Sequence, residues 1–256
     1  MPDFPAIVIG VITYARPTEI RATITALTQR IHYAGPVTLI VSDDSSPGAY
    51  CRDLEYWWSQ TFPRHPWQFR TISTARNSGW GKATNGLLRE AFDNEKADAI
   101  FQIEDDYIAH ADINLSAGVA LLQQEPTLGM VRYRATAGTP MLYYQRETDI
   151  SAYCPEYHEY LGYTQGRMTW LELLPNSPTL WLYSNGAHLK KRDFHDLYGM
   201  YPEGLKLGQT EEAMAHLCKD TMLVHPIAPK IGIQPEFVYM RWDHVGVSYQ
   251  HTEHDK

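Results

Sequence analysis

Apolar runs alternate with amphipathic segments over the first part of the chain. Residues 7–13, IVIGVIT, form a short run rich in β-branched side chains, which is typical of a buried strand. In the segment that follows, 15–31, isoleucine and leucine recur at helical spacing from Ile20 to Ile31. Pro17 stands in the first turn of this segment, where a helix tolerates proline. The pattern predicts a strand followed by a helix.

Further apolar runs predict three more strands before residue 110. They lie at 37–44 (VTLIVSDD), 67–74 (WQFRTIST) and 99–106 (AIFQIEDD), and a helical pattern at 81–92 precedes the last of them. Strands that are apolar throughout and alternate with helices favour an α/β fold with a mainly parallel central sheet flanked by helices. In such sheets the ligand crevice lies outside the carboxyl ends of the strands.

The pattern is weaker after residue 110, and no linker, repeat or domain boundary stands out. We therefore expect one domain over residues 1–256. The expected elements are a helix at 114–124, a strand at 129–136, loops and short strands over 137–170, a strand, an Asn-Gly turn and a helix within 177–199, a helix opened by Thr210 over 210–220, and a strand followed by coil from residue 231.

Acidic residues gather where two of the predicted strands end. The segment 42–46 (SDDSS) carries Asp43 and Asp44, and the segment 104–106 is Glu-Asp-Asp. One such pair alone would be read as a solvated loop. Two clusters at one edge of a parallel sheet repel each other and need a cation or hydrogen-bond donors. Carboxylate oxygens suit Mg²⁺ or Mn²⁺, and magnesium is usually held together with substrate phosphates, so the pattern predicts a metal-bound phosphate ligand.

Two common phosphate-binding motifs are absent. The first strand is followed by YARPTEI, without the Gly-x-Gly-x-x-Gly of a dinucleotide fold. The segment SGWGKAT looks like a phosphate-binding loop, but Arg76 occupies the position of its earlier glycine and Ala83, not serine or threonine, follows Lys82. Both a dinucleotide-binding enzyme and a Walker-type nucleotidase are disfavoured.

Composition and charge limit the binding partners and the cellular compartment that we expect for the protein. The 22 basic and 30 acidic residues give a net charge of -8, which argues against wrapping on a polyanion but leaves room for a local basic patch. Cys51, Cys154 and Cys218 have no spacing of a disulfide framework or zinc site. The N-terminus has no basic leader, and no apolar run approaches about 20 residues. We expect a cytoplasmic protein without a membrane anchor.

Four motifs, taken together, resemble a known family. IGVITYARP, LIVSDDSS, ARNSGWGKATNGLLREAF and FQIEDD follow, in order, the four N-terminal signatures of nucleotide-sugar-dependent glycosyltransferases of the GT-A fold, particularly the large inverting family two. The resemblance covers residues 6–110 well and the rest loosely. It implies a single GT-A, Rossmann-like domain with a nucleotide-sugar-binding half, 1–110, and an acceptor-binding half, 111–256.

The resemblance implies a donor site at the strand ends. The first strand end and the first acidic pair would hold the uracil and ribose of a UDP-sugar, since a carboxylate can accept from a base N–H or a ribose hydroxyl. The segment before the 81–92 helix would pass beneath the donor, with Lys82 offsetting diphosphate charge or lying as an ordinary surface cation. The implied donor-binding residues are Thr13, Tyr14, Arg16, Asp43, Asp44, Asn77, Gly79, Lys82, Glu104 and Asp105.

The acidic triplet corresponds to the Asp-x-Asp metal motif of the family, with Glu104 in place of the first aspartate. This departure makes Asp106 the first choice for contact with Mn²⁺ or Mg²⁺, with Glu104 second. A late histidine is often a third ligand in these folds, and His244 is the candidate, with His251 and His225 as alternatives. A metal there would bridge the acids to the diphosphate and neutralise charge on the leaving nucleotide.

An inverting transfer also needs one carboxylate to take the proton of the acceptor hydroxyl. The family usually supplies it from a Glu-Asp pair that opens a helix, and Glu211 and Glu212 occupy that place. Glu212 aligns with the usual aspartate and is one methylene longer. Acids in a first helical turn are also favoured by the helix dipole alone. Trp181, Tyr183 and Asn185 would line the acceptor site or belong to the core.

The acceptor remains open between classes. A compact chain without membrane segments also resembles phage-type glycosyltransferases that modify hydroxymethylated bases in DNA. KKRDFH at 190–195, with Arg241 and Trp242, would supply a phosphate-binding and stacking surface, and the net charge of -8 opposes this reading. DNA is the leading specific hypothesis, with a saccharide or protein hydroxyl as the alternative. A nucleotidyltransferase and a non-catalytic sugar-nucleotide binder are the competing functions.

Overall fold

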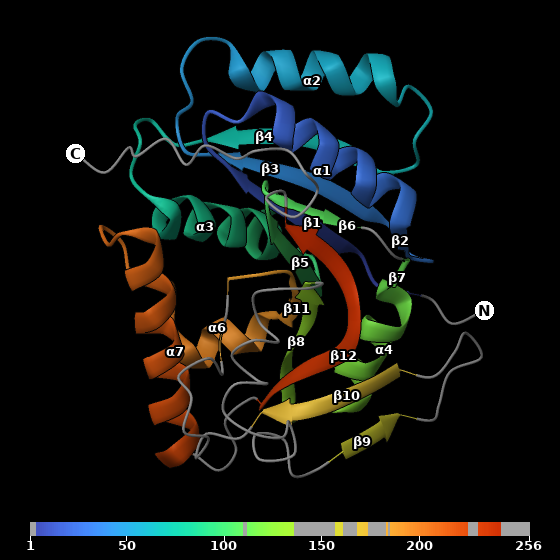
Figure 1. Ribbon diagram of the computed structural model, residues 1–256, viewed down its shortest axis with the longest axis vertical. Coiled ribbons are helices and arrows are strands. Elements are labelled where there is room, and N and C mark those ends of the chain that lie inside the picture. The colour runs from blue at the N-terminus through green and yellow to red at the C-terminus, as the bar shows by residue number, and fades with distance from the viewer. Residues whose placement is uncertain are drawn as a thin grey trace.

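The computed structural model shows a large twisted sheet with helices on both faces (Figure 1). A smaller two-stranded sheet pairs β2 (Ile31–His32) with β7 (Ile113–Asn114). The structure describes residues 4–109, 112–135, 157–160, 168–173, 183, 185–224 and 230–241.

The main sheet has ten strands, and its carboxyl-end edge carries the candidate site. Its first four strands run parallel to one another, the fifth is antiparallel to both of its neighbours, and the seventh is parallel to the sixth. The mainly parallel sheet expected from the apolar runs is thus confirmed. The order is β4 (Gln68–Ser73), β3 (Val37–Asp43), β1 (Ile7–Thr13), β5 (Ala99–Glu104), β11 (His188–Lys191), β8 (Leu128–Ala135), β12 (Lys230–Arg241), β10 (Met168–Leu173) and β9 (Tyr157–Tyr160), with β6 (Tyr107–Ala109) paired to β12.

The helices form two layers, one on each face of the sheet, and each layer packs on its own apolar core. On one face α1 (Pro17–Arg30), α2 (Tyr50–Thr61) and α4 (Leu115–Gln124) pack against the sheet. On the other face lie α3 (Trp80–Arg89), which continues into a π-helical turn η1 (Glu90–Asn94), and the helices α6 (Arg192–Tyr198) and α7 (Leu207–Val224). The predicted stripe of α1 is buried as expected, including Ile20, Ile24 and Leu27.

Helix α2 and strand β11 were not predicted, and α7 begins earlier than predicted. Helix α2 buries only Leu54 and Trp58, so its apolar pattern is weak. The strand expected before the Asn-Gly turn lies outside the described residues, and β11 follows the turn instead. Helix α7 begins at Leu207, not at Thr210, whose hydroxyl donates to the carbonyl oxygen of Lys206.

Strand register sets the order of residues along the site edge. Thr13 lies opposite Asp43, and Ile12 lies opposite Glu104, so the carboxyl ends of β3, β1 and β5 are level. Strand β11 runs the other way, with His188 opposite Gln102. The residues that precede His188 therefore reach the same edge, which runs from β3 through β1 and β5 to the start of β11.

Candidate functional site

The first acidic residue, Asp43, is held by neutral donors. Its carboxylate is 1% exposed and accepts from the main-chain nitrogen of Ser46 at 3.0 Å, from the Ser46 hydroxyl, and from Ser73 Oγ at 3.2 Å. The Cys51 thiol donates to it at 3.6 Å. This net of donors stabilises the charge without a cation.

Asp44 fixes the loop that leads into α3. Its Oδ1 accepts from Thr74 Oγ1 at 2.8 Å and from the Ser78 nitrogen at 2.9 Å, and its Oδ2 accepts from the Gly79 nitrogen at 2.8 Å. Gly79 has φ +86°, a left-handed conformation that favours glycine. Asp44 thus binds the protein main chain, and its contact with a nucleoside stays a prediction.

Thr13 belongs to the same hydrogen-bonded framework. Its Oγ1 donates to Asp105 Oδ2 at 2.7 Å and lies 2.8 Å from the Tyr50 hydroxyl. Thr13 is buried, whereas the next residue, Tyr14, is 42% exposed. Of the two residues predicted at this strand end, Tyr14 is the one with a surface open to a ligand.

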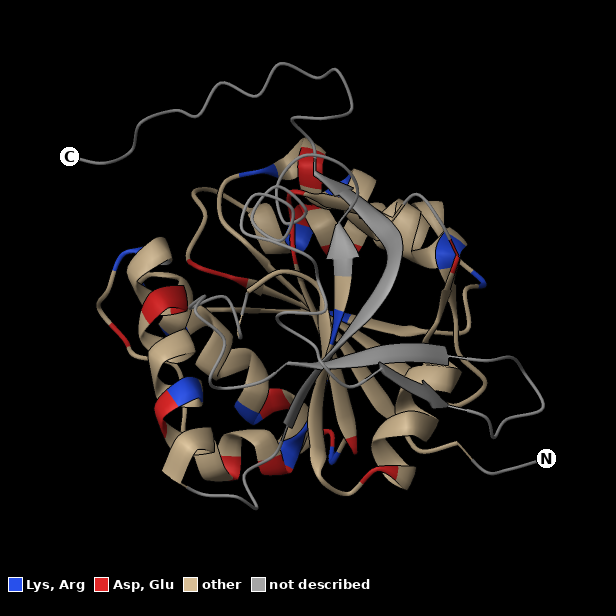
Figure 2. Cartoon of the chain, turned by 60° about the horizontal axis from the view of Figure 1, so that its bottom comes forward, with Lys and Arg blue, Asp and Glu red and all other residues tan. Residues whose placement is uncertain are grey.

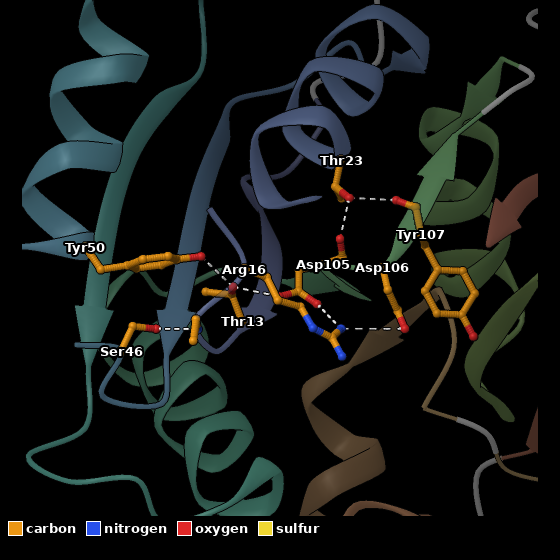
Figure 3. Close-up of polar contacts among 9 residues, drawn as sticks. Thr13, Arg16, Thr23, Ser46, Tyr50, Asp105, Asp106 and Tyr107 are labelled. Atoms are coloured by element: carbon orange, nitrogen blue, oxygen red, sulfur yellow. Dashed lines mark hydrogen bonds and ion pairs between the residues drawn. The ribbon is translucent and has the colours of Figure 1, made fainter. Parts of the chain in front are cut away.

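Asp105 points into the protein, where Arg16 balances its charge (Figure 3). Its side chain is buried, with Arg16 Nη1 2.8 Å from Oδ1. Thr23 Oγ1 donates to the main-chain oxygen of Asp105 at 2.8 Å. Burial raises the pKa of Asp105 to about 6, against the lowering effects of Arg16 and Thr13. Asp105 is therefore a buried carboxylate paired with Arg16 beneath the site, and its contact with the donor stays a prediction.

Asp106 and Glu104 flank Asp105 in the chain. Asp106 Oδ2 lies 3.7 Å from Arg16 Nη1, and its side chain is 18% exposed. Glu104 is half-buried on β5, on the face that carries Gln102, because successive strand residues point to opposite sides. Burial raises the pKa of Tyr201, and the charge of Glu104 adds to that rise, which places Glu104 toward Tyr201.

The oxygens at this strand end suit a hard divalent ion held jointly with phosphates. Within the described ranges, no group of three histidine, cysteine, aspartate or glutamate side chains could surround a metal. The half-buried carboxylate of Asp106, with Glu104 nearby, fits the usual mode in which magnesium keeps one or two carboxylates, waters and substrate phosphates. His244, His225 and His251 lie outside the described residues.

The start of α3 faces the same edge. Asn77 and Lys82 are exposed, and Lys82 lies in the first turn of the helix. A helix N-terminus with a lysine beside it favours an anion. Gly81, one residue earlier, packs against the 201–205 turn so closely that a Cβ there would overlap the main-chain oxygen of Pro202.

The two candidate bases on α7 face different ways. Glu211 is half-buried, and its Oε1 accepts from the main-chain nitrogen of Asn185 at 2.8 Å. It lies on the side of the helix that also carries the buried residues Met214 and Cys218. Glu212 is exposed. The structure therefore brings Glu211 to the start of β11 and leaves Glu212 accessible from solvent.

The three residues predicted to line the acceptor site or belong to the core have different surroundings. Tyr183 is fully buried, and its hydroxyl contacts that of Tyr201, so it belongs to the core. Asn185 is 3% exposed, yet among the residues that the structure describes neither Nδ2 nor Oδ1 of its amide has a hydrogen-bond partner. Trp181 lies outside the described residues. Asn185 thus retains its hydrogen-bonding capacity at the site edge.

A buried set of polar side chains beside the site was not predicted. Lys190 Nζ donates to Gln102 Oε1 at 2.8 Å and to the Tyr201 hydroxyl at 2.7 Å. Burial lowers the pKa values of Lys190, His188 and His195, and the charge of Lys190 adds to the effect on both histidines. The only sequence signal is that polar residues alternate with Leu189 along β11.

The segment KKRDFH does not form the acceptor surface that was predicted for it. Lys190 and His195 are buried, and Lys191 lies opposite Ala99, at the far end of β5 from Glu104. Arg192 forms an ion pair with Asp93 at 2.9 Å. Acidic and basic residues are interspersed on α6 and α7 (Figure 2).

The partners proposed for that segment are placed differently. Arg241, at the end of β12, pairs with Tyr107 in the strand register and so reaches the site edge. Trp242 lies outside the described residues.

The sheet with its acidic carboxyl edge agrees with a sequence comparison. Residues 8–190 match the family described as Glycosyl transferase family 2, so the chain belongs to that family. It therefore has the GT-A fold of that family, with a mainly parallel sheet flanked by helices. No curated protein sequence matches the chain.

Three solved structures with the same fold contain bound nucleotides or nucleotide sugars. S. aureus TarS 1-349 in complex with UDP has a TM-score of 0.59 at 16% identity, and the match covers 93% of this chain and 60% of that one. The Pyrobaculum calidifontis mannosyltransferase PcManGT, with GDP-Man and Mn²⁺, has 0.55 at 17%, covering 91% and 59%. GalNAc-T7 with UDP, GalNAc and Mn²⁺ has 0.58 at 13%, covering 92% and 43%. The chain thus spans less than two thirds of these proteins.

None of the helices in the described part of the chain is long and apolar enough to cross a membrane.

Proposed function

We propose that the protein is a metal-dependent, inverting glycosyltransferase that moves a sugar from a UDP-sugar to an acceptor hydroxyl. The observation that carries this is the division of the acidic triplet: Asp105 is neutralised inside the protein, while Asp106 at the strand end keeps part of its side chain, 18%, exposed. The nucleotide ligands in the TarS and PcManGT complexes, UDP and GDP-Man with Mn²⁺, support the same chemistry.

The donor would lie along the sheet edge from β3 to β5. Exposed Tyr14 offers a face for the base, and buried Asp43 would keep the adjacent loop in place. Lys82 and the start of α3 would meet the diphosphate, where the helix dipole and the ammonium group favour negative charge. Asn77 is exposed just before this helix and would contact the donor from below.

Asp106, with Glu104, would hold Mn²⁺ or Mg²⁺ against the diphosphate. Such an ion acts as a Lewis acid that stabilises the charge of the departing nucleotide. His244 remains the proposed third protein ligand. Arg16 and Thr13 keep Asp105 turned inward, so the metal carboxylate is presented on a strand end that cannot rotate freely.

Glu212 is the proposed base. The acceptor oxygen would attack the anomeric carbon, its proton would pass to the Glu212 carboxylate, and the bond to the nucleoside diphosphate would break with inversion. Glu212 is exposed and therefore reachable by an incoming acceptor. Glu211, bonded to the main chain of Asn185, would position the start of β11 beside it.

We favour a saccharide hydroxyl as the acceptor over a hydroxymethylated base in DNA. The segment KKRDFH, the main support for DNA, lies at the opposite end of β5 or inside the core. The net charge of -8 opposes a polyanion. The neutral amide of Asn185 at the edge suits sugar hydroxyls, which both donate and accept.

The reaction is tested by incubating the protein with UDP-sugars and Mn²⁺ and measuring UDP release. We expect slow donor hydrolysis that EDTA removes and that Asp106→Asn reduces at least about 100-fold, the scale of losing one transition-state charge contact. The exposed acid Asp53 provides the control, Asp53→Asn, which should leave the rate unchanged. UDP release that is indifferent to both EDTA and Asp106→Asn would contradict the metal role.

A second assay tests which glutamate is the base and which class of acceptor receives the sugar. Glu212→Gln should abolish transfer to acceptor while retaining UDP binding, and Glu211→Gln should retain measurable transfer. Oligosaccharides and hydroxymethylated duplex or single-stranded DNA would be supplied side by side. Labelled sugar appearing on DNA would reverse the acceptor preference, and donor binding with no turnover in any condition would favour a non-catalytic binder.

A further inference from the structure

Arg16 is a fixed cation within the acidic triplet. It precedes α1 directly, and its Nη1 donates to Asp105 Oδ1 at 2.8 Å. Asp105 is itself held by Thr13 at its other oxygen, and Thr13 lies against Tyr50. The chain Tyr50, Thr13, Asp105, Arg16 is visible in Figure 3. The guanidinium therefore cannot move without breaking a charge-assisted hydrogen bond to a buried carboxylate.

The same nitrogen of Arg16 faces Asp106. Nη1 lies 3.7 Å from Asp106 Oδ2, and the side chains of Arg16 and Asp106 are 31% and 18% exposed. In a partly buried setting an ion pair at this separation is screened less than one in open water. The carboxylate proposed as metal ligand thus already has a positive neighbour.

A divalent ion on Asp106 would stand close to that guanidinium, and like charges disfavour each other. Among the described residues, no group of three histidine, cysteine, aspartate or glutamate side chains could hold the ion, and Asp105 is already paired with Arg16, so the protein alone does little to offset the added charge. A nucleoside diphosphate would offset this charge, because its phosphate oxygens can bind both the ion and the guanidinium, which binds phosphate well.

We propose that Arg16 is a built-in competitor of the divalent metal at Asp106, so that the ion binds weakly to the free protein and tightly only together with the nucleoside diphosphate. This inference rests on the proposed function. It assigns Arg16 a positioning role: it suppresses metal binding before the donor arrives and couples the two ligands afterwards, which is a reciprocal coupling between them.

A purely structural Arg16 would give a different result. If Arg16 served only to neutralise Asp105, removing its charge would lower stability and leave the affinity of Asp106 for metal unchanged or weaker. Competition predicts the reverse sign for the metal, because the competing charge has gone. Arg16→Lys keeps the charge and is the matched control, whereas Arg16→Gln keeps much of the side-chain length without it.

The test measures Mn²⁺ binding to the full chain by electron paramagnetic resonance, without nucleotide and with saturating UDP. We expect Arg16→Gln to bind Mn²⁺ alone on the order of fivefold more tightly than the wild type, the scale of a partly exposed ion pair. UDP should then enhance Mn²⁺ binding less than in the wild type. Arg16→Lys should stay near the wild type. Unchanged or weaker Mn²⁺ binding by Arg16→Gln would overturn the inference.

Asp106→Asn separates this inference from the proposed function. If Asp106→Asn loses Mn²⁺ binding while Arg16→Gln does not tighten it, only the competition is wrong. If Asp106→Asn binds Mn²⁺ as the wild type does, the metal role of Asp106 is wrong as well. Should Arg16→Gln fail to fold, the double variant with Asp105→Asn removes the buried charge that needs Arg16, and the same Mn²⁺ comparison is made against Asp105→Asn alone.

Discussion

The two sides of the site edge treat buried polar groups in opposite ways. On the side of β1 and β3, Asp43, Asp44 and Thr13 have their oxygens engaged by hydroxyl or main-chain groups. On the side of β5 and β11, three buried side chains each keep at least one atom without a hydrogen-bond partner among the described residues: Gln102 (Nε2), Asn185 (Nδ2 and Oδ1) and His188 (Nε2).

The difference distinguishes polar groups that fix the local structure from polar groups that are able to bind a ligand. A buried carboxylate with all its donors in place stabilises loops and has little left to offer a ligand. A buried polar atom without a protein partner costs free energy, and it is a place where a ligand can be recognised by hydrogen bonds. The side of β1 and β3 is therefore rigid, and the side of β5 and β11 keeps hydrogen-bonding capacity that we propose serves the acceptor.

Asp44→Ala should give the largest effect. It would leave the buried nitrogens of Ser78 and Gly79 without an acceptor and remove a charge-assisted set of bonds, at a cost of about 3 kcal/mol. For a chain of this size the Tm should fall by about 6–12 °C, measured by thermal unfolding. Asp106→Asn, at the accessible acid, should change the Tm little. Equal Tm values for Asp44→Ala and the wild type would break the contrast.

The next effect concerns pH. Burial lowers the pKa values of His188 and His195, so below about pH 6.5 the unfolded chain binds more protons than the folded one. Stability should then fall as the pH drops, by about 1.4 kcal/mol per pH unit for each histidine. His195→Gln should reduce this slope in urea titrations at pH 5.5 and 7, while Gln in place of the exposed His216 should leave it unchanged. A slope that His195→Gln does not alter would refute the assignment.

Tyr50→Phe should have a smaller effect. It removes the hydroxyl that lies 2.8 Å from Thr13 Oγ1 but leaves the bond from Thr13 to Asp105. Loss of one neutral hydrogen bond should cost about 1 kcal/mol, a fall of about 2–4 °C in Tm. A loss as large as that of Asp44→Ala would mean that Thr13 depends on Tyr50 for its orientation.

Asn185→Ala should leave stability almost unchanged, within about 0.5 kcal/mol, because its amide makes no bond that folding would lose. Transfer to the acceptor should nevertheless fall about two- to tenfold in kcat/KM, the value of one neutral hydrogen bond. Donor hydrolysis in the absence of acceptor is the internal comparison and should be retained. A marked drop in Tm without a loss of transfer would place Asn185 among the structural residues.

The sequence predicted the first half of the fold well because its strands carry a continuous apolar signal. Strand β1 has the predicted bounds, and β3, β4 and β5 differ from prediction by one or two residues at their ends. Strand β11 was missed because His188 and Lys190 are polar although both are fully buried. Their burial depends on partners such as Gln102 and Tyr201, which lie far away in the sequence.

The site was predicted by residue type more reliably than by role. The motifs placed acids at two strand ends, as the structure has them, but spacing alone could not say which carboxylate turns inward. Asp105 and Asp44 are engaged because Arg16, Thr13 and the nitrogen of Gly79 approach them in three dimensions. The direction of each side chain is a tertiary property that a local pattern does not contain.

Gly81 carries a consequence for how the two halves of the chain are joined. The atom that a Cβ would strike is a main-chain oxygen, that of Pro202, and no change of rotamer can move it aside. Any larger residue at position 81 would push α3 away from the turn before α7. Helix α3 and the turn before α7 therefore meet backbone to backbone, and we expect position 81 to accept only glycine.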